Sequence, residues 1–359
     1  MPSRTLCVRK TWEPKTDVPN DSGSLPHAGI VRHATETTRS VEDGIPTRSV
    51  GTRAWERVMS QKHMDPPRFV TLVSGFGWHV QDLLRAARDL DVRLDAALFP
   101  ELTGKVGGGH AGTYADAIKL DDVSGVLVRM MPPGSLEQVV FRMDALHRLA
   151  ASGVPVLNAP RAIETAVDKY LTLSRLAAAG LPVPATWVGE TAGAALAAFE
   201  ELGEDVVVKP LFGSEGRGLV RVTDRETFRR VTYAMERIGS VLYVQQYVKN
   251  SGHDLRLFVL GERVLGAIRR HAPGADWRTN VAVGGRAEAF TPDDSMIRLA
   301  LRASSAVGTH MAGVDVLPDS SGRPVVLEVN AVPGWRALAG ATGVDVAREI
   351  LVELRAMTT

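Results

Sequence analysis

The sequence predicts a mixed fold, in which a small parallel α/β domain comes first and an α+β region follows. Between residues 66 and 160, short apolar runs alternate with segments of helical periodicity, which is the pattern of a parallel α/β domain. Further on, apolar runs at 255–260 and 263–270 are separated only by Gly261 and Glu262, which predicts an antiparallel hairpin. A chain of 359 residues is long enough for two or three such domains.

Residues 1–65 have scattered charges, threonines and prolines but no sustained apolar period. Such a segment buries too little apolar surface to offset the entropy of ordering, so we expect a disordered N-terminal extension. Two alternatives stay open. The extension could be a functional tail, or the start codon could be assigned too early, because Met59 and Met64 directly precede the predicted structure.

The elements of the first domain follow from apolar runs and one clear helical period. Val80, Leu83, Leu84 and Ala87 share one face of a helix. The predicted elements are a strand at 68–73, a helix at 78–88, a strand at 125–131, a helix at about 135–151 and a strand at 154–158.

Two glycine-rich loops of this domain carry weak signals. Gly75 and Gly77 would suit a dinucleotide-binding turn, but Val80 stands where the third glycine of that fingerprint belongs. A plain strand-to-helix turn is therefore favoured. The loop at 107–112 could touch a substrate, although a flexible surface loop is the simpler interpretation.

The second region begins with a helix whose end is marked by Gly180 and Pro182. Apolar runs after it predict strands, and two further helical segments lie among them. The predicted elements are helices at 167–179, 293–308 and from about 344, and strands at 205–210, 219–222, 242–248, 255–260, 263–270, 312–317 and 324–330.

Composition narrows the function classes. The 42 basic and 41 acidic residues leave a net charge of +1, which argues against a basic nucleic-acid binder. The single cysteine, Cys7, excludes an internal disulfide framework and suits a reducing compartment. No apolar run is long enough to span a bilayer, and the N-terminus lacks the apolar core of a secretory signal. We expect a cytoplasmic protein with neither nucleic acid nor membrane as partner.

A glycine-rich turn follows a strand that ends in Lys209. Glycines let backbone N–H groups approach phosphate oxygens, and a lysine adds a point charge. This is no Walker motif, because no helix opens on Gly-Lys-Ser/Thr. A purely structural glycine-rich hairpin is as common, so the turn by itself leaves both interpretations open. Its glycines are Gly213, Gly216 and Gly218.

Two apolar strands carry Asp315, Glu328 and Asn330. The two-residue period of a strand puts Glu328 and Asn330 on the same face. Two carboxylates and an amide oxygen make a hard oxygen site, which suits Mg²⁺. A solvent-facing strand edge is the alternative, but acids within an apolar segment need a partner.

A polar segment at 269–280 contains Arg270, Arg278 and Asn280 and is followed by two glycines. Arginine forks and an amide beside a loop can hold a phosphoryl group and a substrate carboxylate. A solvated charged hairpin is the commoner case. This segment therefore supports a functional site only together with the other motifs.

The order of these motifs resembles the ATP-grasp ligases, and more narrowly the glutamate ligases related to the enzyme that adds glutamate to the C-terminus of a ribosomal protein. The resemblance covers about residues 66–357. The segment 129–138, together with Asp168-Lys169-Tyr170, is most similar to the tetrahydromethanopterin–glutamate ligases. The motifs that carry it are Lys169, Lys209 with its glycine-rich turn, Gln245-Gln246-Tyr247-Val248, Asp254-Leu255-Arg256, Asp276 to Asn280, Asp315 and Glu328-Val329-Asn330.

The resemblance implies an ATP-grasp fold, in which two α+β subdomains at 161–240 and 241–359 clasp ATP behind an α/β domain at 66–160. It also implies ATP and Mg²⁺ (or Mn²⁺) as cofactors. The implied site residues are Lys169 and Lys209 on the phosphates, Gly213, Ser214, Gly216 and Gly218 as the lid, Gln245, Gln246, Tyr247 and Val248 along adenine, Asp254 at the ribose with Arg256 beside it, Asp315, Glu328 and Asn330 on the metal, and Arg270, Arg278 and Asn280 at the reacting groups.

Two positions depart from the family. Gln246 replaces a frequent acid, and Val283 replaces a frequent basic residue, which bears on the acceptor more than on catalysis. The chemistry implied is amide formation through an acyl-phosphate, with L-glutamate added to a small carboxylate-bearing acceptor such as a pterin. Addition of glutamate to a protein C-terminus and a non-catalytic ATP-binding regulator are the alternatives. Homo-oligomer formation stays open.

Overall fold

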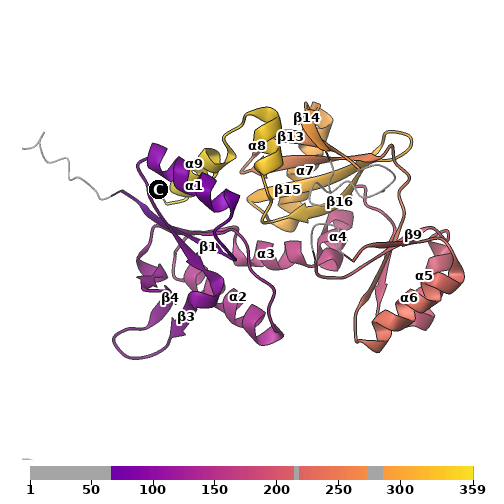
Figure 1. Ribbon diagram of the computed structural model, residues 1–359, viewed down its shortest axis with the longest axis horizontal. Helices are drawn as coiled ribbons and strands as arrows, with labels where there is room; N and C mark the ends of the chain where they lie inside the picture. The colour runs from indigo at the N-terminus through magenta and orange to yellow at the C-terminus, as the bar shows by residue number, and fades with distance from the viewer. Residues whose placement is uncertain (1–65, 214–217, 273–285, 359) are drawn as a thin grey trace, which may run out of the picture. The chain divides into compact units, whose positions relative to one another are not determined.

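The computed structural model describes residues 66–213, 218–272 and 286–358. These belong to one compact unit, Met64–Thr359, and the expected disordered extension at 1–65 lies outside the described residues. Figure 1 shows the arrangement of the elements.

The first sheet is parallel throughout, as predicted, in the order β2-β1-β6-β7. Helices α1 and α2 cover its opposite faces: Phe69 packs into the cluster that contains Leu83 of α1, and Val70 into the cluster that contains Leu146 of α2. The elements are β1 Arg68–Val73, α1 Trp78–Asp89, β2 Arg93–Leu98, β6 Gly125–Val128, α2 Leu136–Ala151 and β7 Val156–Leu157.

A small antiparallel sheet, absent from the predicted elements, is inserted between β2 and β6. The glycine-rich loop at 107–112 connects its first two strands and is exposed over most of its length, as a surface loop should be. Its strands are β3 Leu102–Lys105, β4 Gly112–Ala115 and β5 Ile118–Lys119, with short 3₁₀ turns at Phe99–Glu101 and Leu120–Asp122.

A second antiparallel sheet has the order β10-β9-β11-β8 and packs against α5 and α6. Phe199 of α5 and Phe228 of α6 stack with ring centroids 4.5 Å apart. The elements are β8 Thr186–Gly189, α5 Ala192–Glu201, β9 Val206–Lys209, β10 Val220–Val222, α6 Arg225–Arg237 and β11 Leu242–Gln246.

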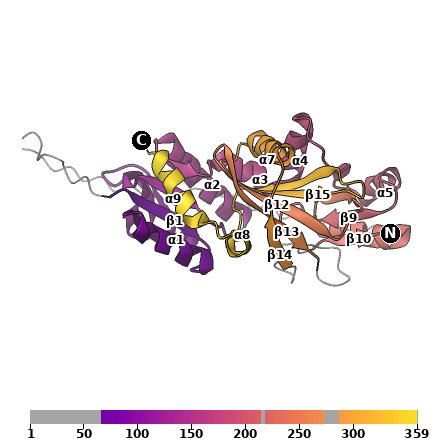
Figure 2. The same ribbon diagram turned by 90° about the horizontal axis from the view of Figure 1, so that it is seen from above.

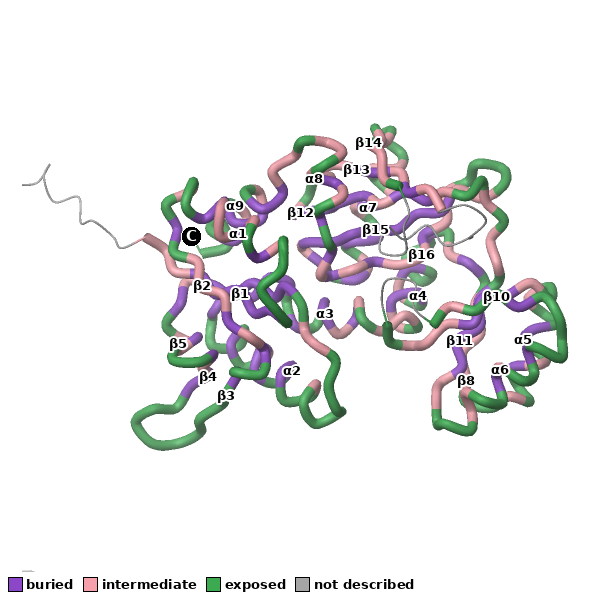
Figure 3. Tube along the Cα trace, in the orientation of Figure 1, coloured by how far each residue is buried: buried purple, intermediate pink, exposed green. Residues whose placement is uncertain are grey.

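The largest sheet is antiparallel, in the order β14-β13-β12-β15-β16, and contains the predicted hairpin. Helices α4 and α7 cover its apolar face, side by side in Figure 2. Figure 3 shows that β12 and β15 are buried over most of their length. The elements are β12 His253–Leu260, β13 Arg263–His271, β14 Arg286–Phe290, α7 Asp294–Val307, β15 Met311–Pro318, β16 Pro324–Asn330, α8 Arg336–Thr342 and α9 Val346–Ala356.

One helix at the start of the second region was not predicted. The helix expected at 167–179 is the second of two, α3 Pro160–Val167 and α4 Lys169–Ala178. The chain breaks at Asp168, whose carboxylate accepts a hydrogen bond from the backbone N–H of Leu171 and so caps α4. The cap places Lys169 in the first turn of the new helix. Within the described ranges, no helix has both the length and the apolar character needed to cross a membrane.

Candidate functional site

One face of the largest sheet is apolar, and the other is polar over the part that carries the predicted site residues. Phe258, Leu260 and Ile268 lie further along that second face and belong to another apolar cluster. Leu255, Val314 and Val329 point into the apolar cluster under α4 and α7. Because strand side chains alternate, their neighbours point to the other face. This polar face carries six of the predicted site residues: Asp254, Arg256, Arg270, Asp315, Glu328 and Asn330.

A buried ion-pair network lies at the centre of the polar face. Arg256 forms a two-pronged pair with Asp315, with Nε to Oδ1 at 2.7 Å and Nη2 to Oδ2 at 2.6 Å. Arg270 binds both oxygens of Asp254, at 2.7 and 2.6 Å, and its Nη2 lies 2.9 Å from Oδ2 of Asp315. Two guanidinium groups and two carboxylates make the network electrically neutral.

The network sets the charge states of its members. Burial by itself raises the pKa of Asp315, but Arg256 and Arg270 outweigh burial and hold that pKa below its usual value. Burial likewise lowers the pKa of Arg270, and Asp315 and Asp254 more than reverse this. Asp315 and Arg270 are therefore charged at neutral pH. Asp254, expected at a ribose, and Arg270, expected at the reacting groups, are engaged with each other inside the sheet.

Lys209 is enclosed at the end of β9. Its ammonium donates to Oε1 of Gln245 at 2.6 Å, and the amide nitrogen of Gln245 donates in turn to the hydroxyl of Thr186 at 2.9 Å. Burial lowers the pKa of Lys209 to about 8, and the charge of Glu328 acts in the opposite direction. Lys209 is thus a desolvated cation within the electrostatic reach of the polar face.

Lys169 lies at the start of the glycine-rich turn. Its ammonium donates to the carbonyl oxygens of Leu211, at 3.2 Å, and Gly213, at 2.8 Å. Burial also lowers the pKa of Lys169, and Glu328 again opposes the shift. The fold therefore brings Lys169, Lys209 and Glu328, which are remote in sequence, into one electrostatic group. Gly218 has a positive φ of 74°, and Ser214 and Gly216 lie outside the described residues.

The strand expected along adenine ends at Gln246 and continues as an extended segment. The backbone N–H of Gln246 donates to Ala185 and that of Tyr247 to Asp205, at 2.9 and 2.8 Å. Tyr247 lies under the guanidinium of Arg221, which is 3.6 Å from the ring centroid. Gln245 is buried, Gln246 is exposed, and Tyr247 and Val248 are half-buried.

Arg221 and Thr186 were not among the predicted site residues. Arg221 is held by a two-pronged pair with Asp205, at 2.8 and 2.7 Å, while it covers Tyr247. Thr186 orients Gln245 from a strand nearly sixty residues earlier. Their roles depend on strand pairing, which leaves no local sequence signal.

The predicted metal ligands lie on two neighbouring strands, where Asp315 is paired with Glu328. The side-chain nitrogen of Asn330 donates to Oε1 of Glu328 at 2.7 Å, which leaves the amide oxygen of Asn330 for other donors or a cation. Asp315 Oδ2 contacts both arginines, whereas among the described residues Oδ1 accepts a hydrogen bond only from Arg256, which leaves one of its lone pairs for a further partner. Among the described residues no three His, Cys, Asp or Glu side chains cluster, so the set depends on the amide of Asn330. Arg278 and Asn280 lie outside the described ranges.

Comparison with known proteins decides the family. The profile of the RimK-like ATP-grasp domain matches residues 166–354, more than half of the chain. A tetrahydromethanopterin:alpha-L-glutamate ligase from Methanosarcina acetivorans is 32% identical over 312 residues, which span 77% of this chain and 95% of that relative. The chain belongs to the RimK-like ATP-grasp family.

A further relative and a solved structure are also similar to this chain. The glutamate–LysW ligase ArgX of Sulfolobus acidocaldarius is 32% identical over 229 residues, 61% of this chain and 81% of that relative. The solved structure of the ATP-grasp ligase PsnB, complexed with a phosphomimetic variant of its minimal precursor, Mg and ADP, has a TM-score of 0.63. It is 23% identical and covers 82% of this chain and 99% of its own.

The ATP-grasp fold expected from the sequence is thereby confirmed. So is the enzyme class: this RimK-like protein is an ATP-grasp ligase, which forms carbon–nitrogen bonds. The identity of its two substrates does not follow from family membership, because its relatives are named for different acceptors.

Proposed function

We propose that this ligase joins L-glutamate to the carboxylate of a small anionic acceptor of the tetrahydromethanopterin type, using ATP and Mg²⁺. An oxygen of the acceptor carboxylate attacks the γ-phosphorus of ATP, and the bond to ADP breaks, which leaves an acyl-phosphate. The α-amino group of glutamate then attacks the acyl carbon. Phosphate leaves with its bridging oxygen, the amine loses a proton, and an amide remains.

The observation that carries this mechanism is the convergence of Lys169, Lys209 and Glu328. Two lysines with pKa values lowered by burial are costly to keep charged, and an anionic phosphate chain would compensate both. Glu328 and Asn330, which are hydrogen-bonded to each other, would supply oxygen ligands to Mg²⁺. Such positioning and charge compensation suffice for phosphoryl transfer without a protein nucleophile.

The chain's own residues divide the work. Lys169, Lys209 and the turn from Gly213 to Gly218 would hold the phosphates, while Gln245 to Val248 would line adenine. Asp254 would approach the ribose, with Arg256 beside it. Glu328, Asn330 and Oδ1 of Asp315 would hold Mg²⁺, whose charge offsets that of the phosphates. Arg270 keeps Asp315 charged and oriented, and Arg278 and Asn280 would bind the reacting groups.

The subdomain limits are part of the same proposal. Residues 161–240 and 241–359 would form the two halves around the nucleotide, and residues 66–160 would contribute to the acceptor side. Support comes from the sheets, since β8 to β11 and β12 to β16 form two separate sheets.

The choice of acceptor is supported by the Methanosarcina relative, which aligns over 95% of its length. The test is to incubate the full chain with ATP, MgCl₂, L-glutamate and tetrahydromethanopterin, and to follow ADP and the product by mass spectrometry. We expect product heavier by one glutamyl residue, formed only when all four components are present. Product formation that persists without ATP, or none at all, would refute the proposal.

A second candidate is glutamate addition to the carboxyl end of a protein or peptide. The glutamate–LysW ligase supports this candidate, because 81% of that ligase aligns with this chain at 32% identity. A peptide with a free C-terminal carboxylate, put in place of tetrahydromethanopterin in the same assay, separates the two. Product with the peptide alone would favour this candidate.

A further inference from the structure

Arg129, the first residue after β6, is a buried cation. The residue is only 4% exposed to solvent. Nη1 donates to the carbonyl oxygen of Val332 at 3.1 Å, and Nε is enclosed without any partner. Within the described ranges no carboxylate pairs with it, and burial lowers its pKa to about 10. An isolated buried charge destabilises a protein unless a ligand compensates it.

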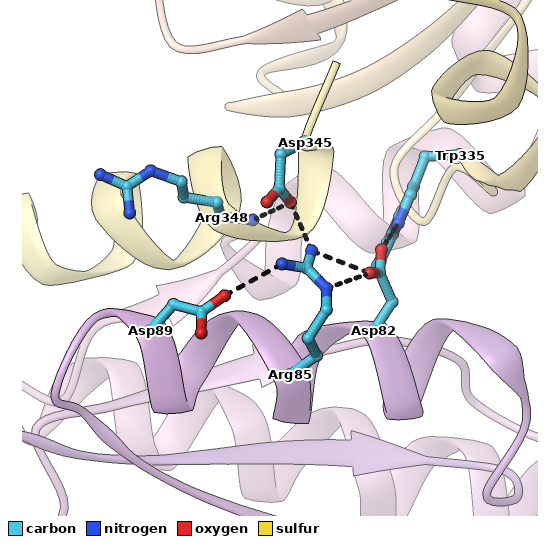
Figure 4. A network of polar contacts seen from close by, with 6 residues as sticks. All are labelled: Asp82, Arg85, Asp89, Trp335, Asp345 and Arg348. Carbon is cyan, nitrogen blue, oxygen red and sulfur yellow. Dashed lines mark hydrogen bonds and ion pairs between the residues drawn. The ribbon is translucent and has the colours of Figure 1, made fainter. Parts of the chain in front are cut away.

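The guanidinium is held in place by an aromatic platform. It lies over the ring of Trp335, 4.8 Å from the centroid, and Trp335 is fully buried. The indole N–H of Trp335 donates to Asp82 at 2.9 Å (Figure 4), and its backbone N–H donates to Nε2 of His79 at 3.2 Å. Burial and Arg129 lower the pKa of His79 to about 4, so His79 is neutral and does not share the positive charge.

Arg129 also lies where an open α/β sheet binds ligands. In this sheet β2 lies on one side of β1, and β6 and β7 lie on the other side of β1. The direction in which strands are added therefore reverses between β1 and β6. Ligands of such sheets bind at the carboxyl ends of the strands at this point. The backbone N–H of Arg129 donates to Leu72 of β1 at 2.9 Å, which fixes Arg129 at that edge.

The same edge exposes large apolar side chains. Phe76 is 57% exposed, Met130 is 47% exposed and Trp78 is 38% exposed. Gly75 and Gly77 leave open space, since a Cβ atom at either position would meet nothing within 4 Å. A buried cation thus borders an exposed apolar surface, which is the chemistry of a site for an aromatic carboxylate.

The backbone connects this edge to the proposed reaction site. Val332, which accepts the hydrogen bond from Arg129, follows Asn330 by two residues. Two residues of extended chain span at most about 7 Å. A molecule held by Arg129 therefore lies within a short distance of the residues proposed to hold Mg²⁺.

We propose that Arg129 is a specificity-determining residue that binds a carboxylate of the acceptor, while Phe76, Trp78 and Met130 contact the acceptor's aromatic part. The assignment rests on the proposed function for the name of the acceptor, but the binding chemistry follows from Arg129 itself. A guanidinium presents two parallel N–H donors to a carboxylate, which a neutral amide cannot match.

The test uses the full chain without ATP or glutamate and two probes that differ only in charge, 1-naphthylacetate and 1-naphthylacetamide. In equilibrium dialysis we expect the wild type to bind the carboxylate about tenfold more tightly than the amide. Arg129→Met should abolish this preference. Arg88→Met, an exposed change on α1, should retain it. Equal binding of both probes by the wild type, or a preference that survives in Arg129→Met, would overturn the proposal.

Thermal unfolding separates recognition from a structural role. Because Arg129 has no acidic partner among the residues that the structure describes, Arg129→Met should melt at the same temperature as the wild type or higher. A clearly lower melting temperature would assign Arg129 to the core and overturn the proposal. Arg129→Lys should raise the KM for tetrahydromethanopterin and leave the KM for ATP unchanged.

The dialysis measures binding and needs no turnover. A chain that fails to glutamylate tetrahydromethanopterin therefore refutes the proposed function, while the binding of the two probes still tests the role of Arg129.

Discussion

Arg270 and Arg129 are buried to nearly the same degree but differ completely in their partners. Arg270 lies between Asp254 and Asp315 and contacts both at 2.9 Å or less. Arg129 has a carbonyl oxygen, an aromatic ring and one enclosed nitrogen without a partner. The degree of burial alone therefore does not reveal the role of a cation.

The difference indicates two uses of a buried arginine. In the first, charges of opposite sign compensate each other and connect β13, β12 and β15 across the polar face. In the second, a bound ligand would supply the opposite charge. Arg270 should accordingly matter for stability, and Arg129 for recognition, and the predictions below test this division.

The largest effect is expected for Arg270→Met. The change leaves Asp254 and Asp315 buried without one of their cations, so the free energy of unfolding should fall by about 3–5 kcal/mol. Urea unfolding followed by circular dichroism measures it. The matched control is Arg263→Met, which removes a half-exposed pair with Glu349 and should cost less than about 1 kcal/mol. Similar losses for both variants would contradict the division.

The next effect concerns the metal ligands beside the network. Glu328→Gln keeps the shape of the side chain but removes its charge, so kcat should fall by about two orders of magnitude, about 2.7 kcal/mol of transition-state stabilisation. The melting temperature should fall less than in Arg270→Met, because among the described residues Glu328 accepts a hydrogen bond only from Asn330 and otherwise acts through its charge on Lys169 and Lys209. Unchanged ADP release in this variant would show that Glu328 holds no metal.

The third effect is a pH dependence caused by Lys209. Its pKa of about 8 in the folded protein lies below the value of about 10.4 in an unfolded chain. Between these values the unfolded state binds more protons, so stability should rise with pH from about 8 to about 10. ATP binding should instead weaken about tenfold above pH 8, as one charged hydrogen bond is lost. Isothermal titration calorimetry of Lys209→Arg, which stays charged, should show a flat profile.

The smallest effect is expected at the half-buried ion pair of Arg85 and Asp345 in Figure 4. Asp345 pairs with Arg85 of α1 at 2.6 Å and caps α9 through the backbone N–H of Arg348. Asp345→Asn removes the charge but can keep the cap, so it should cost less than about 1 kcal/mol. Asp345→Ala removes the charge and the cap, so the free energy of unfolding should fall by about 1 kcal/mol more than in Asp345→Asn. Equal losses in chemical unfolding would mean that the ion pair, and not the cap, stabilises this contact.

Much of the fold could be predicted because its strands are apolar on at least one face. Apolar runs in the sequence predicted the strands β1, β6, β9, β12, β13, β15 and β16. Helix α6 was not predicted, since only Phe228 and Thr232 are buried on an otherwise charged helix. Helix α3 was not predicted either, and the single side chain of Asp168, which caps α4, marks where the two helices separate.

The candidate site was predictable as a set of residue types but not as a network. Lys169, Lys209 and Glu328 stand out in sequence, yet their grouping arises from three separate elements. The pairing of Arg256 with Asp315 joins residues on neighbouring strands that are far apart in the chain. The burial of Arg129 has no sequence signal, because arginine is ordinarily exposed.

The most direct test of the proposed mechanism follows the oxygen that leaves with phosphate. Tetrahydromethanopterin labelled with ¹⁸O in its carboxylates is incubated with the ligase, ATP, MgCl₂ and L-glutamate, and the phosphate released is analysed by mass spectrometry. If the acceptor carboxylate attacks ATP to form an acyl-phosphate, each phosphate formed with the amide carries one oxygen from the labelled carboxylate. Phosphate without the label, despite formation of the amide, would contradict that mechanism.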